Sequence, residues 1–547
     1  MATQIQQFKG HEAAEGCFTS GCFVAPMLVE SELLLVVVGF MVAFMLAFGL
    51  GANDVANSFG TSVGSKVLTL QMACILATIC EISGSVLLGG HVSATVRGGI
   101  IDPTRFNGTE DGPMRLMQGQ VSSLCGACLW MLLATFLKIP VSATHSIVGA
   151  TAGFGLVLFG FQGVQWTGIL KIVISWFVSP VLSGLVSGCL FLIIKYVVLV
   201  KEQSLEPALN TLPFLYGVTI IINVFSVLYG GLHLLSLPEI PLWLTLVVSF
   251  SSGIVAAIIV FFFVRPIIRR RVQKRLELMA SGKWDPTHKD PKHSFCNRIR
   301  NGIRSVFRKG QTVDGSVCTD EEKNKTGPSG DGEIGDTEIQ ALPSNDAVES
   351  AQARTSPSDA VSVTFSEENR SPDGQVYDRP EEAQVFAFAQ ILTATFGSFV
   401  HGGNDVSNAI GPVIGLWIVS TTGNVLMTAK PAVWILFYGG VGISVGLWIW
   451  GRKVMETIGT DLTVITPSSG MCIELGAAIT VLIASKAGLP ISTTHCLVGS
   501  VVLVGFIRSK MSVNWRLFVN IILAWVVTLP AAGGLSALIM YIFTKHA

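Results

Sequence analysis

The stretch GANDVAN at residues 51–57 returns as GGNDVSN at residues 402–408, an offset of 351 positions. A second stretch, PVSATH at residues 140–145, returns as PISTTH at residues 490–495, an offset of 350 positions. Two separate matches at nearly the same offset indicate an internal repeat. We therefore expect a chain built from two copies of one structural unit.

The composition around these motifs is that of a membrane protein. Half of the 547 residues are hydrophobic and only 13% are charged, whereas a soluble protein carries about 25% charge. More than half of the charged residues lie between positions 265 and 383. This composition excludes a set of soluble domains, and it also excludes a nucleic-acid-binding protein, which needs a basic surface. We expect a protein of the lipid bilayer with one polar insert.

Apolar windows long enough to cross a bilayer recur on both sides of the insert. A spanning helix needs about 20 such residues. We expect an all-α polytopic membrane protein with about 12 transmembrane helices. The expected spans lie near residues 32–50, 68–90, 119–137, 144–162, 168–199, 211–236, 241–264, 385–401, 431–450, 465–485, 490–507 and 516–543.

The positive charges beside the spans predict the orientation. Basic residues are concentrated at 265–275, directly after the seventh span, and such clusters mark the cytoplasmic side. The loop 91–118 then lies outside, and it contains Asn107, the acceptor of a glycosylation sequon. We expect both termini, including the N-terminal segment 1–31, to be extracellular.

We expect the insert at residues 265–383 to be a disordered cytoplasmic loop. It is basic at first, then acidic and rich in Ser, Pro and Gly, so it cannot bury enough apolar surface to offset its chain entropy. The first repeat then occupies residues 32–199, a linker helix pair occupies residues 211–264, and the second repeat occupies residues 384–547.

We expect the two repeats to be inverted relative to each other. Each comprises five of the predicted spans, and an odd number of spans reverses the direction of the second copy. Inverted repeats with polar, helix-breaking motifs at matching positions are typical of secondary transporters, which bind substrate and ions at the repeat interface. A channel is the alternative, but it needs a continuous polar stripe, and the polar residues here are concentrated in two pairs of motifs.

The Asn-Asp motifs predict a cation site. They place carboxylate and amide oxygens beside glycines within apolar sequence, and irregular polar backbone at membrane depth must line an enclosed cavity. Oxygen ligands suit a hard cation such as sodium. The candidate sodium ligands are Asn53, Asp54, Asn57, Asn404, Asp405 and Asn408. The alternative is that these residues only cap helix ends, which does not explain two copies of the motif.

The Pro-x-Ser-x-Thr-His motifs predict an anion site. Proline favours the first turn of a helix, and hydroxyls beside the free N–H groups of a helix N-terminus attract anions. Each motif directly follows an apolar span, as the tip of a re-entrant hairpin does, so we expect two tips to hold one tetrahedral oxyanion. The candidate ligands of this oxyanion are Ser142, Thr144, His145, Ser492, Thr493, Thr494 and His495. For the two histidines, packing as hydrogen-bonded core residues stays open.

Two glutamates, Glu81 and Glu474, lie near the middle of predicted spans. A carboxylate at this depth is costly unless it is paired, and such residues are functional by default. We expect them to act as cation ligands or coupling groups. They do not occupy equivalent positions in the two repeats, so we expect their roles to differ.

These motifs resemble those of the inorganic phosphate transporter (PiT) family, whose animal members are type III sodium-phosphate cotransporters. The family signature is similar to residues 51–57 and 402–408, and further family-like stretches are GSVLLG at 84–89, FYGGVG at 437–442 and LTVITPSSG at 462–470. The resemblance covers both flanks of the insert. It implies sodium-coupled uptake of monovalent phosphate, with more than one sodium ion, across the plasma membrane by an elevator-like or rocking movement.

The resemblance also implies roles for residues and partners. It implies that Asp54, Asn57, Asp405 and Asn408 bind sodium, that the hydroxyl residues of the hairpin motifs contact phosphate, and that sodium is a co-substrate with no further cofactor. Gln120 stands where many relatives have glutamate, which puts the role of that carboxylate in doubt here. Some vertebrate members serve as gammaretrovirus receptors, and binding of a viral envelope and a homodimer both stay open for this chain.

Several alternatives stay open at the level of function. Proton coupling in place of sodium, and sulfate in place of phosphate, are the alternatives within transport. A non-transporting phosphate sensor or viral receptor on the same scaffold is another, although both copies of the motif are intact, which favours transport. An enzyme is least favoured, because no nucleophile–base set or metal cluster stands out in the sequence.

Overall fold

The computed structural model describes residues 30–229, 240–281, 376–451, 462–509 and 513–546. These residues are helical, and the only β-type contact among them is an isolated bridge between Ile101 and Val164. The chain divides into two compact units, 1–273 with 365–547 and 274–364. The first, called the membrane unit below, contains every candidate site residue. The predicted N-terminal segment and most of the insert lie outside the described residues.

The first repeat contains six α-helices. The long helices begin and end close to the predicted spans, because each is an apolar run bounded by Gly, Pro or polar residues. They are α2 (Glu30–Asn53), α3 (Val55–Gly64), α4 (Leu70–Gly98), α5 (Gly112–Phe136), α6 (Ala143–Phe159) and α7 (Trp166–Ile194). A π-helical turn, Lys195–Leu199, extends α7.

The linker helix pair comes next along the chain, followed by the second repeat. The linker helices are α8 (Leu205–Leu228) and α9 (Leu242–Ile259), and α10 (Arg265–Ala280) continues from α9 through a π-helical turn. The second repeat contains α13 (Pro380–Thr422), α14 (Val433–Trp450), α16 (Pro467–Lys486), α17 (Thr493–Arg508) and α18 (Trp515–His546).

Each of the twelve predicted spans overlaps one of these helices. Among the described residues, eleven helices are long and apolar enough to cross a membrane, and the twelfth, Thr493–Arg508, is shorter. This helix is one arm of a predicted re-entrant hairpin. A hairpin that turns back inside the membrane does not need arms of full spanning length.

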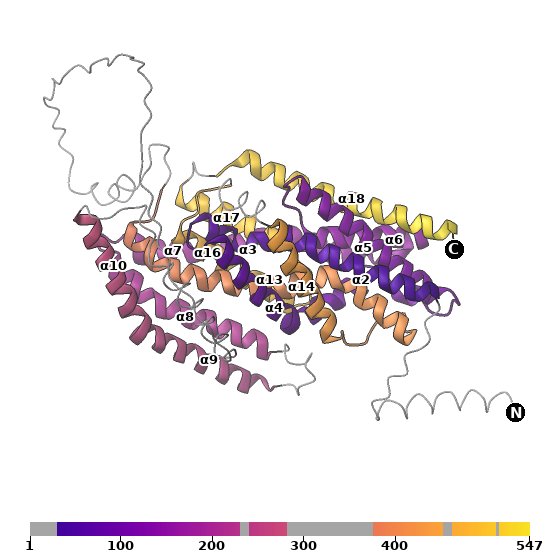
Figure 1. The fold of residues 1–547 in the computed structure, drawn as a ribbon, viewed down its shortest axis with the longest axis horizontal. Coiled ribbons are helices and arrows are strands. Elements are labelled where there is room, and N and C mark those ends of the chain that lie inside the picture. Colours follow the sequence, from indigo (N-terminus) through magenta and orange to yellow (C-terminus); the bar gives the residue numbers. More distant parts are fainter. Residues whose placement is uncertain (1–29, 230–239, 282–375, 452–461, 510–512, 547) are drawn as a thin grey trace, which may run out of the picture. The chain divides into compact units, whose positions relative to one another are not determined.

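The two repeats are interleaved within the membrane unit (Figure 1). Helix α4 of the first repeat packs on α13 of the second, and α14 packs on α2. The last helices are exchanged in the same way, since α18 packs on α5 and α6, and α7 packs on α16 and α17. Glycine permits these close approaches: an added Cβ on Gly149 would overlap the backbone of Leu529 in α18, and one on Gly499 would overlap the backbone of Pro180 in α7.

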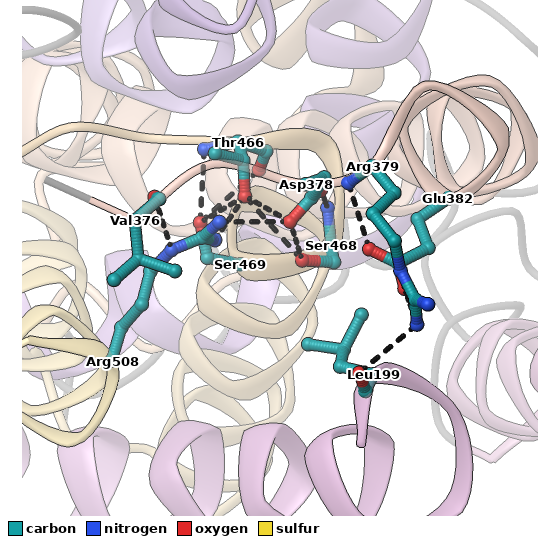
Figure 2. A network of polar contacts seen from close by, with 9 residues as sticks. All are labelled: Leu199, Val376, Asp378, Arg379, Glu382, Thr466, Ser468, Ser469 and Arg508. Carbon is teal, nitrogen blue, oxygen red and sulfur yellow. Dashed lines mark hydrogen bonds and ion pairs between the residues drawn. The ribbon is translucent and has the colours of Figure 1, made fainter. Parts of the chain in front are cut away.

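The helix pairs α5–α6 and α16–α17 form hairpins, called hairpin 1 and hairpin 2 below, whose tips meet inside the unit. The Thr144 hydroxyl of the first tip donates to the Ile491 carbonyl of the second at 2.9 Å. Helix α7 begins beside the base of hairpin 1, where the Gln165 side chain donates to the Ile101 carbonyl. Together with its π-helical turn it is 34 residues long, roughly 50 Å of helix, and it ends at Leu199 beside the base of hairpin 2 (Figure 2). The bases of the two hairpins therefore lie at opposite ends of this helix.

Two expectations from the sequence are corrected. The Asn-Asp motifs were expected to break both helices, but α13 runs without interruption through residues 402–408. At Asp54 the interruption is slight, because its N–H still bonds to the Leu50 carbonyl at 2.7 Å. The glycine at 402 serves close packing instead, since a Cβ there would lie 2.6 Å from the Glu81 carbonyl oxygen.

The second correction concerns the boundaries of the insert, which were expected at residues 265 and 383. Helix α10 covers residues 265–280, and α13 already begins at Pro380. The basic run of α10 simply continues the preceding apolar helix, and the Glu382 side chain caps the start of α13 by accepting from the Arg379 N–H at 2.9 Å.

Candidate functional site

The asparagines of the two motifs tie their helices to the hairpin tips. The Asn53 amide donates to the Ile139 carbonyl at 3.0 Å, and its oxygen accepts from the Val141 N–H at 3.2 Å. The Asn404 amide donates to the Ile491 carbonyl at 3.0 Å. Both asparagines are fully buried. Each motif therefore lies against a hairpin tip in the middle of the membrane unit.

The two aspartates also bind the tips. Asp54 accepts a hydrogen bond from the Thr494 hydroxyl of hairpin 2 at 2.7 Å and one from the Ala143 N–H of hairpin 1 at 3.3 Å. Asp405 accepts from the Thr493 hydroxyl at 3.1 and 3.2 Å. Both carboxylates are 1% exposed. Adjacent threonines of one tip thus contact the aspartates of both repeats.

Asn408 completes the contacts between the repeats. Its amide donates to the Thr144 hydroxyl at 3.2 Å. Its carbonyl oxygen and that of Asn404 are buried and have no hydrogen-bond partner among the described residues. The remaining candidate, Asn57, lies in α3, and its side chain is outside the described part of the structure. Two amide oxygens are therefore free to coordinate a cation.

Glu81 adds a third buried carboxylate to this centre. One of its oxygens accepts from the Ser398 hydroxyl at 2.8 Å, and the other is buried without a partner among the described residues. Glu81 lies within electrostatic range of Asp405 and Asp54. Of the ion pairs found in the described residues, none joins these three acids to a basic side chain.

Glu474 belongs to a different polar cluster. Its carboxylate accepts from the Thr393 hydroxyl at 2.6 Å, the Ser62 hydroxyl at 2.7 Å and the Gln390 amide at 3.3 Å, and also from the Thr61 hydroxyl. The group is 3% exposed. Glu474 is thus surrounded by neutral donors, whereas Glu81 lies near other acids. That their roles differ stays a prediction.

The serines of the tips have a capping role. The Ser142 hydroxyl accepts from the His145 N–H at 3.3 Å, and the Ser492 hydroxyl accepts from the His495 N–H at 3.2 Å. The threonine hydroxyls are bonded to Asp, Asn or carbonyl partners as described above. An anion at the tips must therefore exchange with some of these bonds.

The two histidines form part of a four-ring stack. His145 stacks on Trp176 with 3.5 Å between ring centroids, His495 lies 3.7 Å from Trp525, and the two imidazoles are 4.5 Å apart. The His495 Nδ1 bonds to the Trp176 carbonyl at 3.2 Å. Because a carbonyl only accepts, Nδ1 carries the proton in the neutral ring. The tryptophans occupy equivalent positions in α7 and α18, so the internal repeat of the sequence already pairs them.

Several residues of the centre and of the Glu474 cluster carry no sequence signal of their own. Ser398, Gln390 and Thr393 lie in α13, one to four turns before the second motif, and read as ordinary polar residues of an apolar helix. His401 is similar: its Nδ1 and the Ser58 hydroxyl are 2.7 Å apart. The exposed Asn107 follows the short helix Pro103–Phe106 on a loop, as a glycan acceptor requires.

Comparison with known proteins identifies the family of this chain. The sequence profile described as "Phosphate transporter family" matches residues 50–536. The chain is 39% identical to sodium-dependent phosphate transporter 2 of Xenopus tropicalis, over 94% of this chain and 99% of the relative. It is also 39% identical to sodium-dependent phosphate transporter 1 of Pongo abelii, over 88% and 91% of the two chains.

A solved structure described as "The sodium-dependent phosphate transporter" is similar over 94% of this chain and 99% of that one, with a TM-score of 0.67 and 32% sequence identity. The relatives and this structure carry transporter names, which agrees with the expectation that the chain is not an enzyme. By sequence and by fold, the chain belongs to the phosphate transporter family.

Proposed function

We propose that this protein carries out sodium-coupled symport of inorganic phosphate into the cell. The observation that carries the proposal is the group of three buried carboxylates, Asp54, Asp405 and Glu81, without a basic partner in the described residues, at the place where two hydroxyl-rich tips meet. Buried charges of one sign are strongly destabilising unless cations or protons compensate them. The names of the relatives favour sodium as that cation.

The cation ligands in this proposal are the oxygens of the two motifs. Asp54 and Asp405 supply charge, and the amide oxygens of Asn404 and Asn408, which have no partner among the described residues, supply neutral ligands. Hard cations prefer such oxygen sets. With three carboxylates in one buried region, more than one sodium ion is needed to approach neutrality, which supports a ratio above one sodium per phosphate.

Electrostatics orders the binding of the two substrates. A phosphate anion about 4 Å from one uncompensated carboxylate is repelled by about 4 kcal/mol at an effective dielectric constant of 20. Sodium bound first removes this repulsion and adds attraction of similar size. Phosphate binding then depends on sodium, and by linkage sodium binds more tightly with phosphate present. The tip threonines Thr144, Thr493 and Thr494 are the groups that we propose to contact phosphate.

Glu474, the histidines and the serines have supporting roles in this proposal. The Glu474 carboxylate, which is surrounded by hydroxyl donors, forms a separate cation or coupling site. Ser142 and Ser492 cap α6 and α17, and so fix the positions of the N–H groups in the first turn of each helix. The contact between His145 and His495 holds the two tips together. The monovalent phosphate ion suits a site rich in acceptors, because its hydroxyls donate to them.

We further propose a plasma-membrane location, with both termini extracellular and the large loop cytoplasmic. The exposed sequon at Asn107 and the basic helix α10 lie on opposite sides by this topology, which glycosidase digestion and protease protection test. A homodimer and recognition by a gammaretrovirus envelope stay expectations of the family resemblance.

Radiolabelled phosphate uptake by cells expressing the chain, in sodium and in choline buffers, tests the proposal, with surface biotinylation as the control. We expect uptake in sodium only, and no competition by sulfate, which has no hydroxyl to donate at neutral pH. Uptake that persists in choline contradicts sodium coupling and favours protons. No uptake by protein at the surface favours a sensor or receptor.

A further inference from the structure

A buried ion pair joins the start of α13 to the base of hairpin 2 (Figure 2). Asp378 lies directly before α13, and its Oδ1 accepts from the Arg508 guanidinium at 2.8 Å, the Ser468 hydroxyl at 2.7 Å and the Thr466 hydroxyl at 2.9 Å. Its Oδ2 accepts from the Ser468 N–H at 2.9 Å. The side chains of Arg508 and Asp378 are only 6% and 2% exposed.

These partners are the two ends of hairpin 2. Thr466 and Ser468 lie at the start of α16, while Arg508 is the last residue of α17. The Arg508 guanidinium also donates to the Thr466 hydroxyl and, at 2.9 Å, to the Val376 carbonyl. One carboxylate and one guanidinium thus hold both arms of the hairpin at its base.

The neighbouring residue, Arg379, fastens the same segment to the end of α7. Its guanidinium donates to the carbonyls of Leu199 at 3.1 Å, Lys201 at 2.6 Å and Glu202 at 2.8 Å, and it pairs with Glu382 at 2.7 Å. We call residues 376–379 the strap. The strap bonds to hairpin 2 on one side and to the C-terminal end of α7 on the other.

The other repeat has no such charges at the equivalent positions. With the offset of 350, Arg508 corresponds to Leu158, and Thr466 and Ser468 correspond to Leu116 and Gln118. The base of hairpin 1 is closed instead by apolar contacts, including the ring pair Phe106–Phe159 at 5.0 Å. Among the described residues, a buried ion pair at the base of a hairpin is therefore found in the second repeat alone.

This asymmetry has an energetic consequence for an inverted-repeat transporter. Access alternates when the two repeats exchange conformations, so two repeats with equal contacts give two access states of nearly equal free energy. A contact present in one repeat alone shifts that equilibrium by its own free energy. A buried charged hydrogen bond is worth about tenfold or more in an equilibrium constant.

We propose that the strap is a conformational latch: the Asp378–Arg508 pair and the Arg379 contacts close the base of hairpin 2 and favour the state that is open on the opposite side. The inference rests on the proposed transport function and topology, by which this base faces the cytoplasm. The latch therefore stabilises the outward-facing state, ready to bind external sodium and phosphate. Asp378, Arg379 and Arg508 are positioning residues, because none of them contacts the central carboxylates in the described structure.

The test measures the apparent KM for phosphate from both sides, at equal sodium concentrations and zero voltage, in right-side-out and inside-out vesicles. When a conformational equilibrium shifts, apparent affinity falls on one side and rises on the other. For Asp378→Asn we expect the ratio of external to internal KM to rise about tenfold. Asp378→Glu, which keeps the charge, should recover part of this ratio.

The control variant is Asp102→Asn. It removes the Asp102–Arg105 pair, which is 4.0 Å long with side chains 38% and 37% exposed, so the KM ratio should not change. Arg379→Lys tests the other end of the strap. It loses the guanidinium bonds to the end of α7, and we expect it to raise the KM ratio as well.

Two results contradict the latch. One is an unchanged KM ratio in Asp378→Asn, or in Arg379→Lys if the former does not reach the membrane. The other is a KM that rises equally on both sides, because such a change shows that the strap stabilises the fold without shifting the equilibrium between the access states. Absence of sodium-dependent uptake by the unmodified chain is a separate result, because it overturns the proposed function itself.

Discussion

Replacing Asp54 by Asn tests the central carboxylates most sharply, because the two side chains have nearly the same shape. Asp54 accepts from Thr494 and from the Ala143 N–H, and it is 1% exposed. A unit charge about 4 Å from sodium contributes about 4 kcal/mol at an effective dielectric constant of 20. Its loss corresponds to a roughly thousandfold weaker sodium site.

The assay is phosphate uptake as a function of sodium concentration, normalised to surface protein. We expect Asp54→Asn to lose uptake at physiological sodium while it still reaches the membrane, because removing a buried charge does not disrupt packing. In the purified protein, sodium should raise the melting temperature of the unmodified chain and have a much smaller effect on the variant.

The control for this substitution is Asp111→Asn, since Asp111 is exposed and makes no capping hydrogen bond. It should leave the sodium dependence unchanged. An Asp54→Asn protein with the sodium dependence of the unmodified chain refutes the assignment of this carboxylate to the cation site.

Three further predictions concern packing and the polar clusters. Gly499→Ala places a Cβ 2.6 Å from the Pro180 Cα, so we expect the free energy of unfolding to fall by about 1–3 kcal/mol and the melting temperature to fall with it. The same change at Gly534, which has open space around it, should leave the melting temperature unchanged. Glu474→Gln loses charged hydrogen bonds worth about 1.5–3 kcal/mol, which thermal unfolding should detect; an unchanged midpoint contradicts the geometry. Trp525→Ala removes a ring pair worth about 1 kcal/mol and should weaken phosphate affinity about fivefold, and Trp525→Phe should restore it; equal affinities for the two variants exclude a role for stacking.

The sequence predicted the fold well wherever a motif occurs in both repeats, because each copy supports the interpretation of the other. The offset of 350 or 351 positions identified the paired motifs, the inverted repeats and the hairpin tips, and the structure brings Asp54, Asp405, Thr494 and Asn408 together as this reasoning requires. Whether these residues bind sodium and phosphate stays a prediction.

The sequence was less informative where contacts depend on register between distant helices. Glu81 bonds to Ser398, 317 positions away, and no spacing rule connects them. The glycines at 402–403 looked like a helix break, but they permit close packing against α4 within a continuous helix. The strap residue Asp378 sits at the edge of a long acidic segment, so only its contacts distinguish it from the other acids nearby.

The central claim is that sodium and phosphate bind one shared, buried centre. Direct binding of radiolabelled phosphate to the purified protein, with sodium replaced by choline at constant ionic strength, tests it most directly. We predict saturable phosphate binding in sodium and at least a hundredfold weaker binding in choline, as expected from removing about 3–4 kcal/mol of electrostatic attraction. Equal phosphate affinity in the two buffers would contradict the claim.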